Sequence, residues 1–99
     1  MSDHYILNGH EVVPVDLLTW ARFFANFEHR VVAKTTVGGA MISTVFLGLD
    51  HNYGGGRPHI FETMVFGGPL DEDQMRYSTW DEAQRGHDAM VQRVTEAKP

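Results

Sequence analysis

The sequence predicts a single α+β domain in which an antiparallel sheet of about five strands packs against two helices, in the order β-β-α-β-β-β-α. Two dipeptides, Asn8-Gly9 and Gly38-Gly39, each separate a pair of strand-forming runs, which is the pattern of a two-residue hairpin. Two further apolar runs, 43–49 and 59–66, flank a polar loop with three consecutive glycines. Near the C-terminus, apolar residues recur at three- and four-residue spacing, which is typical of a helix packed on a sheet.

Length and composition limit the class of protein. A chain of 99 residues forms one domain, and 42% hydrophobic with 21% charged residues is the balance of a folded protein. The absence of cysteine excludes disulfides, thiolate metal sites and cysteine nucleophiles. A net charge of −5, with only eight Lys and Arg residues scattered along the chain, disfavours binding to nucleic acid. The start lacks the pattern of a signal peptide, and no apolar run approaches the ~20 residues of a membrane span, so we expect a soluble, cytoplasmic protein.

The first hairpin is predicted from Asn8-Gly9, because a type I′ turn requires positive φ at both central positions. Its register would pair Leu7 with His10 and Tyr5 with Val12. We expect the ladder to end at Pro14, since proline has no N–H to donate.

A helix is predicted from Leu17 to about Phe27, with Asp16 as its N-cap. Its apolar surface is wider than one face of a small domain needs. Either the N-terminal hairpin covers this surface, or part of it is an interface with another molecule. The candidate interface residues are the aromatic ones, Trp20, Phe23, Phe24 and Phe27.

The second hairpin joins strands at 30–37 and 40–49, and pairing of Val37 with Ala40 sets its register. On one face, Lys34 then lies opposite Ser43. The other face carries Val31, Ala33, Thr35, Val37, Ala40, Ile42, Thr44 and Phe46. A third strand is predicted over 59–66, followed by an acidic turn over 71–73. In that strand, the residues that point one way are His59, Phe61, Thr63 and Val65.

The last predicted helix begins with a capping box, in which Thr79 is followed three residues later by Glu82, and it runs to about Thr95. Gly86 weakens such a helix by about 1 kcal/mol relative to alanine, so we expect it to allow a close approach to the sheet. One buried stripe is expected from Trp80, Ala83, His87, Met90, Val91 and Val94.

Three stretches, STVFLGLDHNYGGG, FETMVFGGPLDEDQMRYSTWDEA and GHDAMV, resemble a family of small uncharacterised proteins encoded by bacteriophages and prophages. The opening YILNGHEVVPVDLLTWARFF is similar to the start of the same family, so the resemblance covers most of the chain. It implies an origin in a phage or mobile element, and it assigns neither an activity nor a catalytic residue to this chain. Small proteins from that source often bind a host or phage protein, and some block host defences.

The glycine loop, from Asp50 to Arg57, is a candidate binding surface. It is longer than a usual hairpin loop, and long loops often carry binding function. Its glycine amides with Arg57 could hold an anion, although the loop has neither pattern of a phosphate-binding motif. The alternative is a plain connection between strands, in which glycine supplies positive φ. The candidate binding residues are Asp50, His51, Asn52, Tyr53 and Arg57.

His87 is the candidate site residue on the last helix. It is either a boundary histidine satisfied by a hydrogen bond or, if it faces Glu62 or Asp50, an acid–base group. A metal site would have to join His51, His87 and a carboxylate, since no pair of histidines has the spacing of a helical metal motif. If His87 is an acid–base group, no nucleophile accompanies it, so we assign no catalytic residue. We also assign no metal and no cofactor.

Three functions remain open. The first is a non-enzymatic phage-type accessory protein that binds another protein, such as a host defence protein that it inhibits, and that forms a homodimer. The second is a domain that binds a small ligand, anion or metal through the Asp50–Arg57 loop and His87. The third is a structural component of a virion or packaging complex.

Overall fold

The computed structural model describes residues 3–50 and 55–97 and confirms the α+β class. Strand pairing divides the described residues between two antiparallel sheets, so the expectation of one sheet with about five strands was wrong in detail. The elements are β1 His4–Asn8, β2 Glu11–Val15, α1 Leu17–Phe24, the 3-10 helix η1 Phe27–Arg30, β3 Val31–Val37, β4 Ala40–Phe46, β5 Phe61–Phe66, β6 Gln74–Tyr77 and α2 Trp80–Glu96.

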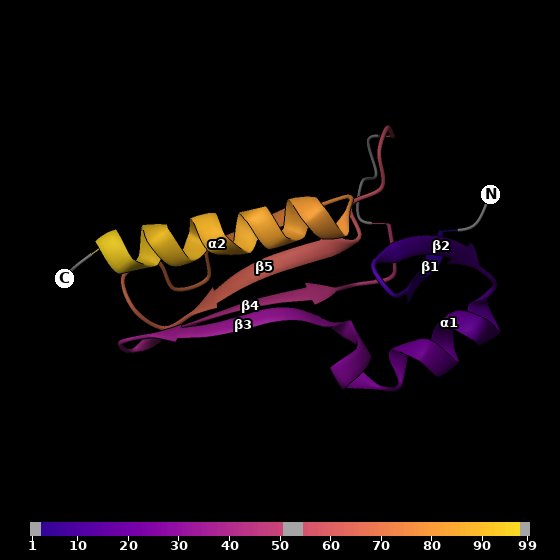
Figure 1. Cartoon of the computed structure of the whole chain (residues 1–99), viewed down its shortest axis with the longest axis horizontal. Helices are drawn as coiled ribbons and strands as arrows, with labels where there is room; N and C mark the ends of the chain where they lie inside the picture. Colours follow the sequence, from indigo (N-terminus) through magenta and orange to yellow (C-terminus); the bar gives the residue numbers. More distant parts are fainter. Residues whose placement is uncertain (1–2, 51–54, 98–99) are drawn as a thin grey trace.

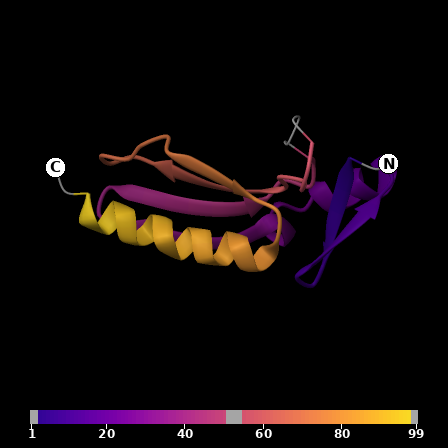
Figure 2. The same ribbon diagram turned by 90° about the horizontal axis from the view of Figure 1, so that it is seen from above.

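The larger sheet has the strand order β3-β4-β5-β6, and α2 lies along one of its faces (Figures 1 and 2). The unit formed by β1, β2 and α1 lies beyond one end of this sheet, which makes the molecule long, at 45 × 29 × 19 Å (Figure 1). The core under α2 has two clusters of buried apolar residues. One consists of Ala40, Ile42, Val65, Met90 and Val94, and the other of Phe46, Ile60, Phe61 and Ala83.

Strand β6 was not predicted from the sequence. It is the edge strand of the larger sheet and pairs with β5, Tyr77 lying opposite Phe61 and Met75 opposite Thr63. Its sequence, QMRY, alternates between polar and apolar residues over only four positions, and Met75 is 52% exposed. An alternation this short, next to an acidic turn, is too weak a pattern to identify an edge strand.

The first hairpin has a different register from the one predicted. Leu7 pairs with Val12 and Tyr5 with Pro14, so the two turn residues are Gly9 and His10. Gly9 has φ of +62° and His10 has negative φ, as in a type II′ turn with glycine at its first central position. The ladder also continues through Pro14, which a two-stranded sheet allows because one side of each strand is an edge.

The junction between the two sheets lies just after β4, which ends at Phe46 and not at Leu49. Gly48 has φ of +74°, and its carbonyl accepts a hydrogen bond of 2.8 Å from the Tyr5 N–H of β1. His4 and Leu49 form an isolated antiparallel bridge beside it. Further along the chain, β5 begins at Phe61 and not at 59, and both Ile60 and Phe61 are fully buried.

The hairpin of β3 and β4 follows its predicted register from Val37 and Ala40 as far as Ala33 and Thr44. A bulge between Val31 and Ala33 then pairs Val31 with Val45, in place of the expected Phe46. The bulge also brings Val32 onto the core cluster around Phe46, although strict alternation would point it to the opposite face.

Helix α2 begins as predicted. Thr79 accepts a hydrogen bond from the Glu82 N–H at 3.1 Å and donates to the Glu82 carboxylate, also at 3.1 Å. The expectation for Gly86 is confirmed, because a Cβ atom at this position would overlap the ring of Tyr77.

Across residues 3–50 and 55–97, no helix is both long and apolar enough to cross a membrane.

Candidate functional site

Helix α1 is the most exposed apolar element. It ends at Phe24, three residues earlier than predicted, and Asp16 caps it by accepting the Thr19 N–H at 2.8 Å. None of its eight residues, LLTWARFF, is buried. Leu17 and Leu18 are each 61% exposed, and Phe27, in the following η1, is 57% exposed. Leucine and phenylalanine side chains that remain open to this extent on neighbouring elements form a candidate interface.

The predicted interface residues divide into two groups. Phe23 points into the molecule and packs edge-on against the buried ring of Phe46, with centroids 5.9 Å apart. Trp20 lies against Gly48, where a Cβ atom would approach the Trp20 Nε1 to 2.5 Å. Phe24 stacks on Trp20 at 4.7 Å, and Phe27 remains exposed. The two leucines at the start of the helix were missed, although they complete the broad apolar surface that the sequence shows.

Arg30, at the end of η1, lies between two of these aromatic rings. Its guanidinium carbon lies 3.7 Å from the centroid of Phe24 and 5.0 Å from that of Phe27, which are cation–π contacts. We call Leu17, Leu18, Phe24, Phe27 and Arg30 the α1–η1 surface. It combines exposed apolar side chains, aromatic rings and an arginine, which are the residue types that contribute most to protein interfaces.

The Asp50–Arg57 loop is described only at its ends, and the predicted residues His51, Asn52 and Tyr53 lie outside the described residues. Asp50 accepts a hydrogen bond of 3.1 Å from the His59 N–H. Arg57 forms two hydrogen bonds to the Glu82 carboxylate, at 2.8 and 3.1 Å. This ion pair lowers the pKa of the Glu82 carboxyl. The two ends of the loop therefore anchor it to the start of β5 and to the first turn of α2.

His87 does not face a carboxylate. It is 2% exposed under α2, where its Nε2 lies 2.9 Å from the Thr35 hydroxyl and its Nδ1 lies 2.7 Å from the Thr44 hydroxyl. Burial lowers the pKa of His87, and the charge of the neighbouring Asp88 opposes this effect. Glu62 lies on the opposite face of the sheet and pairs with Arg76 at 3.0 Å.

A chain of hydroxyl groups crosses the sheet beneath His87. The Tyr77 hydroxyl on β6 donates to Thr63 on β5 at 3.2 Å, and Thr63 is hydrogen-bonded to Thr44 on β4. With one proton per hydroxyl, we assign Thr63 as the donor to Thr44 and Thr44 as the donor to the His87 Nδ1. The Nε2–H of His87 then donates to Thr35 on β3. The sequence carries a signal for this network, since Thr35, Thr44 and Thr63 all occupy core-facing positions of successive strands.

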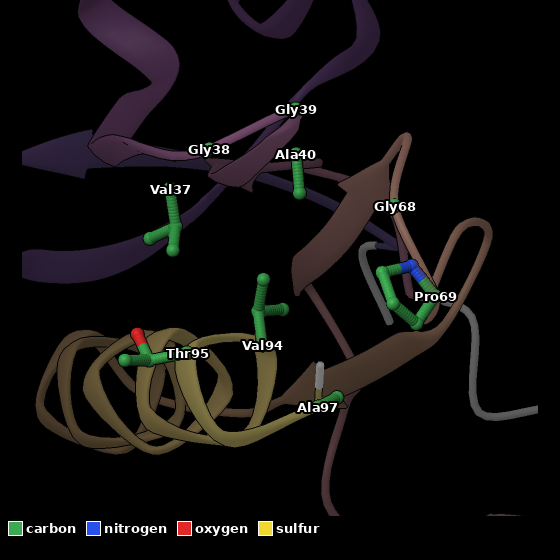
Figure 3. Close-up of a pocket in the computed structure, with 9 residues that line it drawn as sticks. All are labelled: Val37, Gly38, Gly39, Ala40, Gly68, Pro69, Val94, Thr95 and Ala97. Carbon is green, nitrogen blue, oxygen red and sulfur yellow. The ribbon is translucent and has the colours of Figure 1, made fainter. Parts of the chain in front are cut away.

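A cleft lies at the C-terminal end of α2, between the helix and the turns that follow β3 and β5 (Figure 3). It has a volume of about 380 Å³, which lies in the range of small-molecule sites. Apart from the Thr95 hydroxyl, which donates to the Val91 carbonyl, the lining is apolar side chains and backbone, and none of its side chains titrates. The lining residues are Val37, Gly38, Gly39, Ala40, Gly68, Pro69, Val94, Thr95 and Ala97. The sequence does not reveal it, because two separate turns and a helix end have to meet to form it.

Across the part of the chain that the structure describes, no three His, Asp or Glu side chains gather as a group that could hold a metal ion. Comparison with known protein families, with curated proteins and with solved structures finds no match to this chain.

Proposed function

We propose that this chain is a non-enzymatic accessory protein that acts by binding another protein through the α1–η1 surface. One observation carries the proposal: none of the residues in the apolar helix α1 is buried, and Leu17 and Leu18 are each 61% exposed. Full burial of an exposed leucine side chain is worth about 1.5–3 kcal/mol, and a bound partner would gain the share of it that belongs to the area still open.

The arrangement of hydroxyl groups around His87 supports a role without catalysis. The Thr44 hydroxyl lies 2.7 Å from the His87 Nδ1. In enzymes, a catalytic hydroxyl nucleophile and its general base lie at a similar distance. Both side chains are closed to solvent, at 0% and 2% exposure, so a substrate could not reach them. We interpret the pair as a part of the core.

The biological setting is proposed from the resemblance to phage and prophage proteins. A small protein of that origin with an exposed apolar helix suits the inhibition of a host protein, including a defence protein, inside the host cell. Self-association through the same surface is the other form of this proposal. A role in the virion is a third, which mass spectrometry of purified particles would separate from the other two.

A paired set of variants tests the interaction. We expect Leu17→Glu with Leu18→Glu to abolish capture of a protein partner from host lysate, or self-association in size-exclusion chromatography with light scattering. Met75→Glu is the matched control. Met75 is also an exposed apolar residue, at 52%, but it lies on β6 of the larger sheet and not on the α1–η1 surface. A chain that is monomeric and captures no partner, or equal capture by all variants, would rule out this function.

The second candidate is the binding of a small apolar ligand in the cleft at the end of α2, favoured by its volume and lining. An environment-sensitive apolar dye such as 8-anilinonaphthalene-1-sulfonate is a suitable probe. Binding here requires that Thr95→Trp, at the rim of the cleft, removes the dye fluorescence. Fluorescence that persists in this variant would place the dye elsewhere and count against the cleft.

A further inference from the structure

Arg30 is a cation whose orientation is fixed before any partner binds. It lies at the end of η1, where its guanidinium group stacks at 3.7 Å over Phe24 and lies 5.0 Å from Phe27. The planar guanidinium suits such stacking, whereas the compact ammonium group of lysine does not. Less side-chain entropy is therefore lost when a partner binds this arginine than when it binds a mobile one.

Arg30 has no anionic partner within residues 3–50 and 55–97. The ion pairs of this part of the chain join Arg57 with Glu82, Arg76 with Glu62, and Arg93 with Asp73. The Nε–H of Arg30 is buried without an acceptor, and burial lowers the pKa of its guanidinium group. The terminal nitrogens make no hydrogen bond to the described residues and are not among the buried unsatisfied atoms, so solvent reaches them.

The acidic residues that lie close to Arg30 in the sequence do not pair with it. Glu28, two residues earlier in the same 3-10 helix, forms no ion pair with Arg30. Asp16, at the far end of α1, already accepts the Thr19 N–H.

The apolar neighbours of Arg30 extend along one side of α1. Leu17 and Phe24 are seven residues apart, so they lie on the same side of the helix, separated by about 10 Å. The exposed Leu17 and the ring that carries Arg30 consequently face the same way. A segment that covers both would meet apolar side chains at one end and a guanidinium group at the other.

We propose that Arg30 is the recognition cation of the α1–η1 surface and that its partner is a protein segment presenting a carboxylate flanked by apolar side chains. The carboxylate would accept two hydrogen bonds from the solvent-accessible nitrogens of Arg30, while the apolar side chains cover Leu17, Leu18 and Phe27. This inference rests on the proposed function, since it names the chemistry of the partner for the same surface.

Selection from a displayed library of random 16-residue peptides, with the full chain as bait, tests this chemistry directly. We expect the selected peptides to carry Asp or Glu next to Leu, Ile or Phe. Synthetic copies of these peptides should bind Arg30→Gln at least tenfold more weakly than the native chain in a fluorescence polarisation titration, and Arg30→Lys should restore only part of the affinity. Circular dichroism of both variants checks that they are folded.

The outcomes separate the two proposals. Selected peptides without acidic residues, or equal affinity for the native chain and Arg30→Gln, would overturn the role of Arg30. If those peptides still failed to bind Leu17→Glu with Leu18→Glu, the surface itself would stand. A library that yields no binder, or binders that ignore the leucine variants, would overturn the inference and the proposed function together.

Discussion

The Nδ1 atom of His87 lies 2.7 Å from the hydroxyl oxygen of Thr44, in a part of the core where Thr44 is fully buried. This hydrogen bond joins α2 to the centre of the larger sheet. With the donor order assigned above, the Thr44 hydroxyl donates to Nδ1, so the neutral ring of His87 carries its proton on Nε2. A polar network of this kind contributes to stability only when every member has its partner.

Thr44→Val is therefore expected to destabilise the protein by about 1–3 kcal/mol, although valine has nearly the same shape. The substitution leaves the Nδ1 of His87 without a donor and the Thr63 hydroxyl without an acceptor. Chemical denaturation followed by circular dichroism measures the change. Thr36→Val on β3 is the control, since Thr36 is exposed and its replacement should change the free energy of unfolding by less than about 0.5 kcal/mol. Equal effects of the two substitutions would contradict the network.

The pH dependence of stability follows from the same residue. Burial lowers the pKa of His87 in the folded protein below its ordinary value of about 6.5. The unfolded chain therefore binds a proton at a higher pH than the folded chain does. The free energy of unfolding is highest above pH 6.5 and falls as the pH drops below it, by at most about 1.4 kcal/mol per pH unit from this group.

Denaturation curves between pH 7.5 and 5 measure this slope. His87→Gln removes the titrating ring while keeping a polar side chain, and we expect its stability to change less across the same interval. An equally steep fall in this variant would assign the effect to other groups, such as the five remaining histidines.

Gly86→Ala is expected to destabilise the protein by more than 1 kcal/mol, against the normal preference of helices for alanine. The reason is steric, since a Cβ atom at Gly86 would overlap the ring of Tyr77 on β6. Thermal unfolding compares it with Arg85→Ala at an exposed position of α2, which should be neutral within about 0.5 kcal/mol. A more stable Gly86→Ala variant would show that β6 does not lie against the helix.

Arg57→Ala is expected to cost no more than about 1 kcal/mol, because its ion pair with Glu82 lies at the surface, with side chains 64% and 32% exposed. The same variant tests whether the loop binds anions. If titration with inorganic phosphate raises the melting temperature of the native chain and not that of Arg57→Ala, the loop is an anion site. Identical responses would leave Arg57 with a structural role.

Much of the fold was predictable because local rules governed it. The glycine turn between Val37 and Ala40, the cap at Asp16 and the capping box at Thr79 each depend on a few neighbouring residues. The first hairpin was misjudged at the same local level, since Gly9 occupies the first position of its turn and not the second. Strand β6 was missed because its polar–apolar alternation covers only four residues.

The candidate site was less predictable, because it depends on which apolar residues remain uncovered. The sequence predicts a helix with excess apolar surface, but only the packing of Phe23 on Phe46 and of Trp20 on Gly48 decides that Leu17 and Leu18 stay exposed. Likewise, the position of Arg30 depends on η1, a single 3-10 turn that no periodic pattern announces.

The link between β1 and the segment after β4 has a consequence for the order of folding. In the larger sheet each strand pairs with its neighbour in sequence, so its loops close at small entropic cost. The hydrogen bond from Tyr5 to Gly48 and the bridge from His4 to Leu49 instead join distant parts of the chain. The N-terminal unit is thus expected to dock late and to open first, so that its amides exchange with solvent ahead of those in β4 and β5.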